Sequence, residues 1–467
     1  MNLFVTIIFA ICYCIAEFSP LVEVENSTYR LMMVLTATLI APVMAMMQIR
    51  WVANRLIQSR GSWDLQNAIV SRLSRNHSIV WGATGLLVFA GLDWPSLVAV
   101  TWMLADVPVL YELVLLSPLM LSLVGSWFAL FDIQQLYLRP SKQWSINWQK
   151  RWAFVSVRIR MHLMTMLVPL LILLTGLRFS HLIQELSVPQ IVLGSALLGL
   201  WISAVIPFLF LFIWETRPIA DLQLRKDLQD VCQSSGVSIA KMRVWKTGNQ
   251  IANAAVTGLL PGFRVVLLTD ALLKYFTSDE VAAIVRHEVG HVKLLHLPLK
   301  ILFVTLPMVA LILDQTHAKG IHQFLASAVG EGGIFGFTGD QITPCLIAVS
   351  FIIYLFVVLR WLNHRLEHEA DLFAAMELST SGSNQPNQVT RSALEKLAAI
   401  APQQLTRSTF LHPSILSRIA LLESAAEDAS IAKEFRRSLH RRNAVILVPW
   451  IVLMMIAALA LFNGLSR

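Results

Sequence analysis

Charged residues are scarce in this chain. Only 14% of its 467 residues are Asp, Glu, Lys or Arg, whereas soluble globular proteins carry about 25%. Apolar residues reach 56%. So few charges cannot cover the surface of a soluble protein of this length, so much of the chain must face lipid, and the same composition excludes intrinsic disorder.

Cysteine is also rare. The four cysteines show neither paired metal-ligand spacing nor a dense framework, which excludes a secreted disulfide scaffold: Cys12, Cys14, Cys232 and Cys345. Cys12 and Cys14 lie within an apolar run, so we expect them to be small, buried apolar side chains.

Acidic residues are fewer than basic ones, 29 against 37, for a net charge of +8. In a soluble protein this excess would suggest a nucleic-acid partner. Here the basic residues flank apolar runs, so the excess indicates orientation in a membrane, and we expect a lipid bilayer and no nucleic acid as a partner.

Long apolar runs are abundant, and a helix needs roughly 20 apolar residues to cross a bilayer. Runs of about this kind occupy residues 2–16, 31–47, 79–92, 107–131, 161–177, 191–213, 299–313, 344–359 and 444–462. The run 79–92 is either a separate span or the first part of an interrupted segment. The sequence therefore predicts eight or nine spans, the first of them uncleaved because no Lys or Arg precedes it.

The charges of the connecting loops predict the orientation. Residues 50–77 contain five arginines and residues 133–160 contain six basic residues, whereas residues 17–29 and 93–106 contain no Lys or Arg. Basic loops stay in the cytoplasm. The N-terminus and the polar segments 214–298 and 361–443 are then cytoplasmic, in a bacterial inner membrane or, alternatively, a eukaryotic endomembrane.

The first of these segments has the pattern of a small α+β unit. We expect an amphipathic helix over residues 216–235, strands over 241–246 and 264–269, and an edge strand within 249–258. A second helix begins after the hydroxyl residue Thr277 and runs to Leu297, with Pro298 ending it.

That second helix carries a His-Glu-x-x-His motif at residues 287–291. Residues four apart share a helix face, so His287 and His291 can bind one metal ion. Glu288 lies one residue round the helix, where it can serve as the general base for a water molecule at a zinc ion. Gly290 in mid-helix indicates close packing.

A catalytic zinc ion needs a third protein ligand. Glu367 and Asp371 are four residues apart in a second acidic helix, so one carboxylate can bind the metal while the other holds a ligand imidazole. We expect His368 and Glu369 to be solvated or ion-paired, and His296 to be an ordinary helix histidine.

These motifs resemble the integral-membrane zinc metallopeptidase family of the type I CAAX prenyl endopeptidases and the HtpX-like proteases. The resemblance covers about residues 221–423 and includes residues 253–258 (Asn-Ala-Ala-Val-Thr-Gly), His287–His291, Glu367-x-x-x-Asp371 and His412-Pro413 with Arg418. It implies one Zn²⁺ ion held by His287, His291 and Glu367, with Glu288 as general base.

The resemblance also implies that Asp371 supports a ligand of the metal without binding the metal itself, and that His412 contacts the substrate or the tetrahedral intermediate. Family members often have Ser-Arg shortly before the ligand Glu, whereas this chain has Asn363-His364, which leaves open the ion pair that such an arginine makes. The segment with Asn253, Ala254 and Gly258 can bind an extended substrate as an added strand, or it is a small-residue loop packed on the catalytic helix.

Glu112, near the outer end of its apolar run, is expected to reach toward the interface as a snorkelling carboxylate. We therefore expect a mainly α membrane protein whose small zincin-like α+β catalytic domain lies on the cytoplasmic side. The expected parts are a multi-span region (1–213), a first catalytic part (214–298), a two-span insertion (299–360), a second catalytic part (361–443) and a last span (444–467).

The expected function is zinc-dependent endopeptidase activity on membrane or membrane-proximal proteins. The alternative is a membrane sensor or scaffold whose zinc site only organises its cytoplasmic segments. A purely structural site would normally carry four protein ligands and gives Glu288 no purpose, which favours the enzyme.

Overall fold

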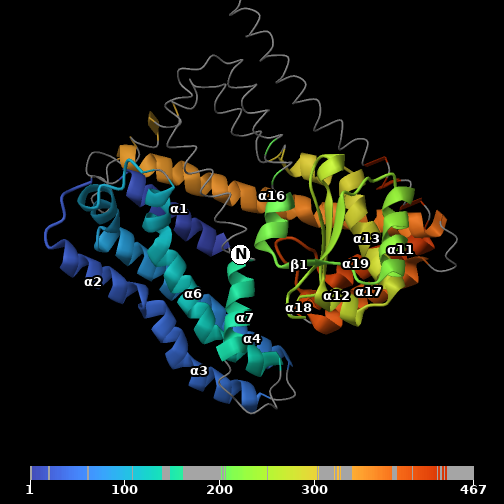
Figure 1. Ribbon diagram of the computed structural model, residues 1–467, viewed down its shortest axis with the longest axis horizontal. Helices are drawn as coiled ribbons and strands as arrows, with labels where there is room; N and C mark the ends of the chain where they lie inside the picture. Colours follow the sequence, from blue (N-terminus) through green and yellow to red (C-terminus); the bar gives the residue numbers. More distant parts are fainter. Residues whose placement is uncertain are drawn as a thin grey trace, which may run out of the picture. The chain divides into compact units, whose positions relative to one another are not determined.

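A computed structural model describes residues 3–18, 21–59, 63–107, 109–138, 148–160, 207–249, 251–301, 339–380, 386–401 and 403–428, with a few single residues outside these ranges. The described part is mainly helical, with one small sheet. It divides into two compact units, one of residues 1–180 and 309–356, the other of residues 181–308 and 357–467 (Figure 1).

The described residues of the first unit form helices. These are α1 (Leu3–Phe18), α2 (Ser27–Thr38), α3 (Ile40–Gln58), α4 (Trp63–Leu86), α5 (Trp94–Ser96), α6 (Leu110–Leu138), α7 (Trp148–Arg158) and the first part of α16 (Gly339–Thr380), with π-helical turns η1 (Leu87–Gly91) and η2 (Leu97–Thr101). Two indole N–H groups tie helices to α6, because Trp81 donates to the carbonyl of Leu119 at 3.2 Å and Trp94 donates to that of Leu115 at 3.0 Å. Both indole N–H groups are therefore paired within the apolar interior.

Among the described residues, three helical segments are long and apolar enough to cross a membrane: Ser27–Gln58, Leu110–Ile133 and Val349–Met376. A fourth candidate is the pair Ala68–Gly91 and Trp94–Thr101, which bends by 57° at its break. This bend agrees with the interrupted-segment interpretation of the run 79–92. The expected spans at 161–177 and 444–462, and most of those at 191–213 and 299–313, lie outside the described residues.

Two expectations for side chains in this unit can be compared with the structure. Cys12 and Cys14 are both buried, as predicted. The snorkelling of Glu112 was wrong: the residue is fully buried, and its carboxylate accepts a 2.7 Å hydrogen bond from the backbone N–H of Val109. The carboxylate satisfies a backbone donor at the start of α6, which a charge reaching into water would leave unpaired.

The second unit is built on a four-stranded sheet in the order β1-β2-β4-β3. The strands are β1 (Thr216–Pro218), β2 (Lys241–Trp245), β3 (Ala254–Thr257) and β4 (Val265–Thr269). β2 and β4 are parallel, whereas β1 and β3 pair antiparallel with them at the two edges. The expected strands are confirmed, and the third one is indeed an edge strand.

The helix predicted over residues 216–235 was wrong in its first part. Residues Thr216–Pro218 form β1 instead, with Thr216 opposite Trp245, and the helix α11 covers Leu222–Ser234. Asp221 caps α11 by accepting the backbone N–H groups of Gln223 and Leu224, so the helix begins there and not at Thr216. Gly236, with φ +68°, follows the end of the helix as expected.

The remaining helices of this unit are α12 (Asp270–Tyr275), α13 (Ser278–Lys293), the second part of α16 (Gly339–Thr380), α17 (Pro386–Ile400), α18 (Gln403–Thr406) and α19 (Ile415–Glu427). Helix α13 packs against β3, α11 and α17 (Figure 1). Its first turn is fixed by a capping box in which Thr277 and Glu280 satisfy each other's backbone N–H groups. The cap and the buried apolar face together hold α13 in place.

The predicted end of this helix was wrong. Helix α13 stops at Lys293, and Leu295 takes a left-handed conformation with φ +57°. A new helical stretch begins at His296 and includes Pro298, which therefore does not terminate the catalytic helix. The break changes the direction of the chain directly after the His-Glu-x-x-His motif.

Candidate metal centre

Helices α13 and α16 approach closely at Gly290. A Cβ atom at this position would lie 2.9 Å from Cδ1 of Phe373 and 3.5 Å from Cα of Ala370. Because glycine has no side chain, the helix that carries Glu367 and Asp371 can pack directly against the helix that carries the motif. The close packing predicted from Gly290 is confirmed.

This packing brings three side chains of metal-ligand type together. Nε2 of His291 lies 3.2 Å from Nε2 of His287 and 3.2 Å from Oε1 of Glu367, and Nε2 of His287 lies 3.5 Å from Oε2 of Glu367. Ligand atoms about 2.0–2.1 Å from a tetrahedral zinc ion are separated by roughly 3.3 Å. The two imidazoles and the carboxylate therefore have the atom types and spacing that fit one zinc ion.

Glu288 lies beside this cluster. Its carboxylate belongs with His287 and His291 to a group whose ligand-type atoms lie within 4.8 Å of one another. The side chain of Glu288 also lines the adjoining cleft, where a substrate has access to it. Both Glu288 and Glu367 therefore have carboxylates close to the two imidazoles, and the carboxylate of Glu367 lies 3.2 Å from Nε2 of His291 and 3.5 Å from Nε2 of His287.

A buried ion pair supports His287 from behind. Nδ1 of His287 lies 2.9 Å from Oδ1 of Asp371, and Arg418 holds the same carboxylate through two hydrogen bonds of 2.8 and 2.6 Å. Burial lowers the pKa of His287, but the Asp371 and Glu367 carboxylates outweigh it and raise the pKa to about 10. Burial also lowers the pKa of Arg418, and Asp371 reverses the shift and raises it.

The arginine that pairs with Asp371 thus comes from α19, not from the residues before Glu367. Sequence reasoning noted Arg418 only within the His412-Pro413 element and left its partner open. The 47 residues between Arg418 and Asp371 give no local signal for the pair. Arg365 instead points to Glu369, with 3.5 Å between its Nε atom and the carboxylate.

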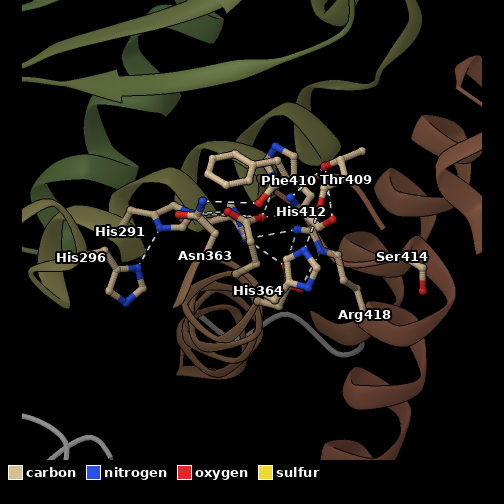
Figure 2. A network of polar contacts seen from close by, with 12 residues as sticks. His291, His296, Asn363, His364, Thr409, Phe410, His412, Ser414 and Arg418 are labelled. Atoms are coloured by element: carbon tan, nitrogen blue, oxygen red, sulfur yellow. Dashed lines mark hydrogen bonds and ion pairs between the residues drawn. The ribbon is translucent and has the colours of Figure 1, made fainter. Parts of the chain in front are cut away.

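His412 lies at the exposed side of the cluster. Its Nδ1 atom is 2.7 Å from Oε2 of Glu367, and its side chain is 38% exposed. Figure 2 shows His412 with the neighbouring Thr409 and His364. His364 contacts the carbonyl oxygen of Thr409 at 2.8 Å and takes no part in the cluster. The loop before α19 is therefore tied to α16 close to the metal centre.

A cleft of about 320 Å³ runs past the cluster. One wall comes from the edge-strand segment, with Asn253, Ala254 and Gly258, and the other from Glu288 and His412. Gly258 has φ +106°, and a Cβ atom there would lie 2.7 Å from the carbonyl oxygen of Phe263, so no other residue fits without strain. The structure thus brings every predicted site residue except the buried Asp371 to this cleft or to the cluster beside it.

Two residues near the cluster were not predicted to take part in it. Nδ1 of His296 lies 2.7 Å from Nδ1 of His291, and Glu369 is buried beside His296. The expectation that Glu369 is solvated or ion-paired is confirmed in its second form, because its buried carboxylate lies 3.5 Å from Nε of Arg365. A His-Glu-x-x-His helix with a carboxylate from a second helix, next to an open cleft, is the arrangement of a metallopeptidase.

Comparison with known proteins agrees with this class. The profile of Peptidase family M48 matches residues 218–426. The chain is 28% identical over 204 residues to a Protease HtpX homolog of Desulfotalea psychrophila, covering 41% of this chain and 70% of that protein. It is also 28% identical over 232 residues to a Protease HtpX homolog of Herminiimonas arsenicoxydans, covering 44% and 72%.

The crystal structure of S. mikatae Ste24p is similar with a TM-score of 0.49 and 17% sequence identity, over 83% of this chain and 99% of that one. The sequence matches confirm the resemblance to the HtpX-like and CAAX-protease family over the segment 218–426. The protein is a metalloprotease, and its apolar helices are those of a membrane protein.

Proposed function

We propose that this protein is a membrane-embedded endopeptidase that uses one zinc ion to hydrolyse peptide bonds of membrane or membrane-proximal proteins at the cytoplasmic face. The observation that carries the proposal is the cluster of His287, His291 and Glu367 beside an open cleft. Three protein ligands leave one position of a tetrahedral zinc ion open for water or substrate, whereas a structural site fills all four positions with protein ligands.

The proposed ligands are Nε2 of His287, Nε2 of His291 and the carboxylate of Glu367. Zinc bound there would supply Lewis acidity that polarises the scissile carbonyl and lowers the pKa of water. Asp371, held by Arg418, accepts the Nδ1 proton of His287 and so directs Nε2 of that ring toward the metal position.

Glu288 is the proposed general base. Its position beside the cluster and in the cleft wall lets it accept a proton from the attacking water and pass that proton to the leaving amine. His412 lies where a substrate carbonyl would enter, and its hydrogen bond to Glu367 fixes the orientation of its ring. We propose that His412 contacts the substrate beside the reacting carbonyl.

Strand β3 is the proposed docking edge for the substrate. It pairs with β4 on one side only, and it forms a wall of the cleft that contains Glu288. An extended peptide can add to such an edge through main-chain hydrogen bonds. The small side chains of Ala254 and Ala255 leave room for it, so the substrate would be recognised mainly as extended backbone.

The proposed orientation, with a cytoplasmic N-terminus and active site in a bacterial inner membrane, follows from the loop charges. Single cysteines at the exposed positions Ser278 and Ser424, in a background with all four natural cysteines replaced by alanine, test it. An impermeant thiol reagent applied to right-side-out cells should label neither position, and it should label both in inverted vesicles. Labelling in intact cells would contradict the cytoplasmic assignment.

The central test compares Glu288→Gln with wild type. The variant should retain zinc, because its ligands are unchanged, and should lose cleavage of an unfolded membrane protein in reconstituted vesicles. The matched control is Asp279→Asn, an exposed carboxylate in the first turn of the same helix, which should cleave normally.

A chelator should abolish wild-type cleavage, and added zinc should restore it. Bound zinc with no cleavage by the wild type would favour the alternative, a non-proteolytic zinc-binding sensor or scaffold. Cleavage by Glu288→Gln at the wild-type rate would refute the proposed mechanism.

A further inference from the structure

The second ligand histidine has a support of its own, separate from the one behind His287. His291 turns its Nε2 atom toward Glu367 and its Nδ1 atom toward His296, with 2.7 Å between the two Nδ1 atoms. Figure 2 shows His296 facing His291 across this contact. The His296 side chain is 1% exposed, so the contact is closed to solvent.

The backbone is bent in a way that makes this contact. On a continuous helix, residues five apart lie about 140° apart around the axis and cannot face each other. Helix α13 ends at Lys293 instead, and Leu295 adopts φ +57°, a conformation unfavourable for a leucine. Such strain persists where the surroundings enforce it, and here it returns His296 to the ligand histidine.

A buried carboxylate lies behind His296. Nε2 of His296 is 3.3 Å from Oε2 of Glu369, whose side chain is 4% exposed. The other oxygen of Glu369 lies 3.5 Å from Nε of Arg365, which is 43% exposed and reaches solvent. A row of polar groups therefore runs from the ligand His291 through His296 and Glu369 to the surface.

The protons in this row can be assigned from the acceptors. A carboxylate only accepts, so the ion pair with Glu369 favours the tautomer that carries the proton of His296 on Nε2, although the two atoms are not aligned as a hydrogen bond. Nδ1 of His296 is then the acceptor, and Nδ1 of His291 donates to it. That leaves Nε2 of His291 with a lone pair directed at Glu367 and the metal position.

We propose that His296 and Glu369 are positioning residues that hold His291 in the tautomer and ring orientation needed to bind zinc. This inference rests on the proposed zinc site. Each ligand histidine then has its own carboxylate, Asp371 in direct contact with His287 and Glu369 acting through His296. In this proposal His296 and Glu369 act through His291 and do not bind the metal themselves.

The test measures zinc affinity of the full-length protein in detergent, by competition with a fluorescent chelator. His296→Phe keeps an aromatic ring but removes the acceptor for His291, and zinc affinity should fall 10- to 100-fold, the usual loss for such outer partners. His296→Gln, whose amide oxygen can accept the same proton, should recover part of that loss. Glu369→Gln should weaken zinc binding by a smaller factor, since its amide oxygen can still accept.

The matched control is His364→Phe, which removes a half-buried histidine of α16 whose Nε2 atom contacts the backbone carbonyl of Thr409. Its zinc affinity should stay within twofold of wild type. Cobalt substitution adds a spectroscopic readout, because a misoriented His291 changes the visible absorption of tetrahedral Co²⁺, whereas a general loss of stability does not.

Wild-type zinc affinity and an unchanged cobalt spectrum in His296→Phe would overturn the inference while leaving the proposed zinc site intact. If His296→Phe fails to fold, Glu369→Gln decides, and wild-type affinity there has the same meaning. A wild-type protein that binds no zinc overturns the proposed function, and this inference with it.

Discussion

Replacing Gly290 by alanine should separate the stability of the protein from the geometry of its metal centre. The added methyl group gains about 1 kcal/mol of helix propensity. It would also lie 2.9 Å from the ring of Phe373, and overpacking of this kind costs about 1–3 kcal/mol. The two terms largely cancel, so the free energy of unfolding should fall by less than about 2 kcal/mol.

The change in the positions of the metal ligands has no compensating term. Relief of a 2.9 Å contact moves α16 away from α13 by roughly half an ångström, and metal sites tolerate deviations of only about 0.2 Å. Glu367 would then be displaced from His287 and His291. We expect zinc affinity and cleavage to fall at least tenfold, with little change in the temperature of unfolding measured without metal.

Zinc competition and cleavage assays on Gly290→Ala check this expectation. Gly262→Ala is the matched control, because no atom lies within 4 Å of the added methyl position and both properties should be unchanged. Gly290→Ala with wild-type zinc affinity would show that close helix contact does not set the ligand spacing, and the reasoning would be refuted.

Three further predictions concern buried and exposed charges. Arg418→Leu leaves the carboxylate of Asp371 buried without its ion-pair partner and should destabilise the protein by about 3–5 kcal/mol, whereas Arg418→Lys should lose less; thermal unfolding in detergent measures both. Burial raises the pKa of Glu280, but its hydrogen bonds, first that from Lys396, outweigh burial and lower the pKa below the ordinary value. The ionised Glu280 therefore makes its full contribution to the free energy of unfolding above the unfolded-state pKa of about 4.3, and this contribution is lost as the pH falls through the lower folded-state pKa. Thermal stability should then decline less steeply on acidification in Glu280→Gln than in wild type. Glu215→Gln breaks the ion pair with Lys246, whose carboxylate is 51% exposed, and should change the free energy of unfolding by less than about 1 kcal/mol. A larger loss in a denaturation curve at neutral pH would contradict this prediction.

The sequence predicted the parts of the site that have local signals. The cap at Thr277 places the start of α13, and the four-residue spacings in 287–291 and 367–371 place pairs of side chains on single helix faces. The edge strand was recognisable because a segment of small residues lies between two strands rich in Val and Leu. Each of these patterns involves residues only a few positions apart, so it can be recognised in a single sequence.

The parts that were missed depend on contacts between distant segments or on one backbone angle. The pairing of Thr216 with Trp245 overrode the helical spacing after residue 216, since the antiparallel ladder satisfies backbone groups that the apolar pattern ignores. The left-handed residue in the turn after α13 is Leu295, and not the Gly or Asn from which such a conformation can be predicted. Without that turn, the contact between His296 and His291 cannot be deduced.

The separation of the site residues along the chain has a consequence for biosynthesis. The proposed ligand His287 and its supporting Arg418 are 131 residues apart, and a ribosome needs roughly 7–26 s to cover that distance at 5–20 residues per second. During this interval the catalytic helix exists without the arginine that fixes Asp371, and for most of it without Glu367. A nascent chain therefore cannot cleave its neighbours at the membrane until both halves of the site have been translated and joined.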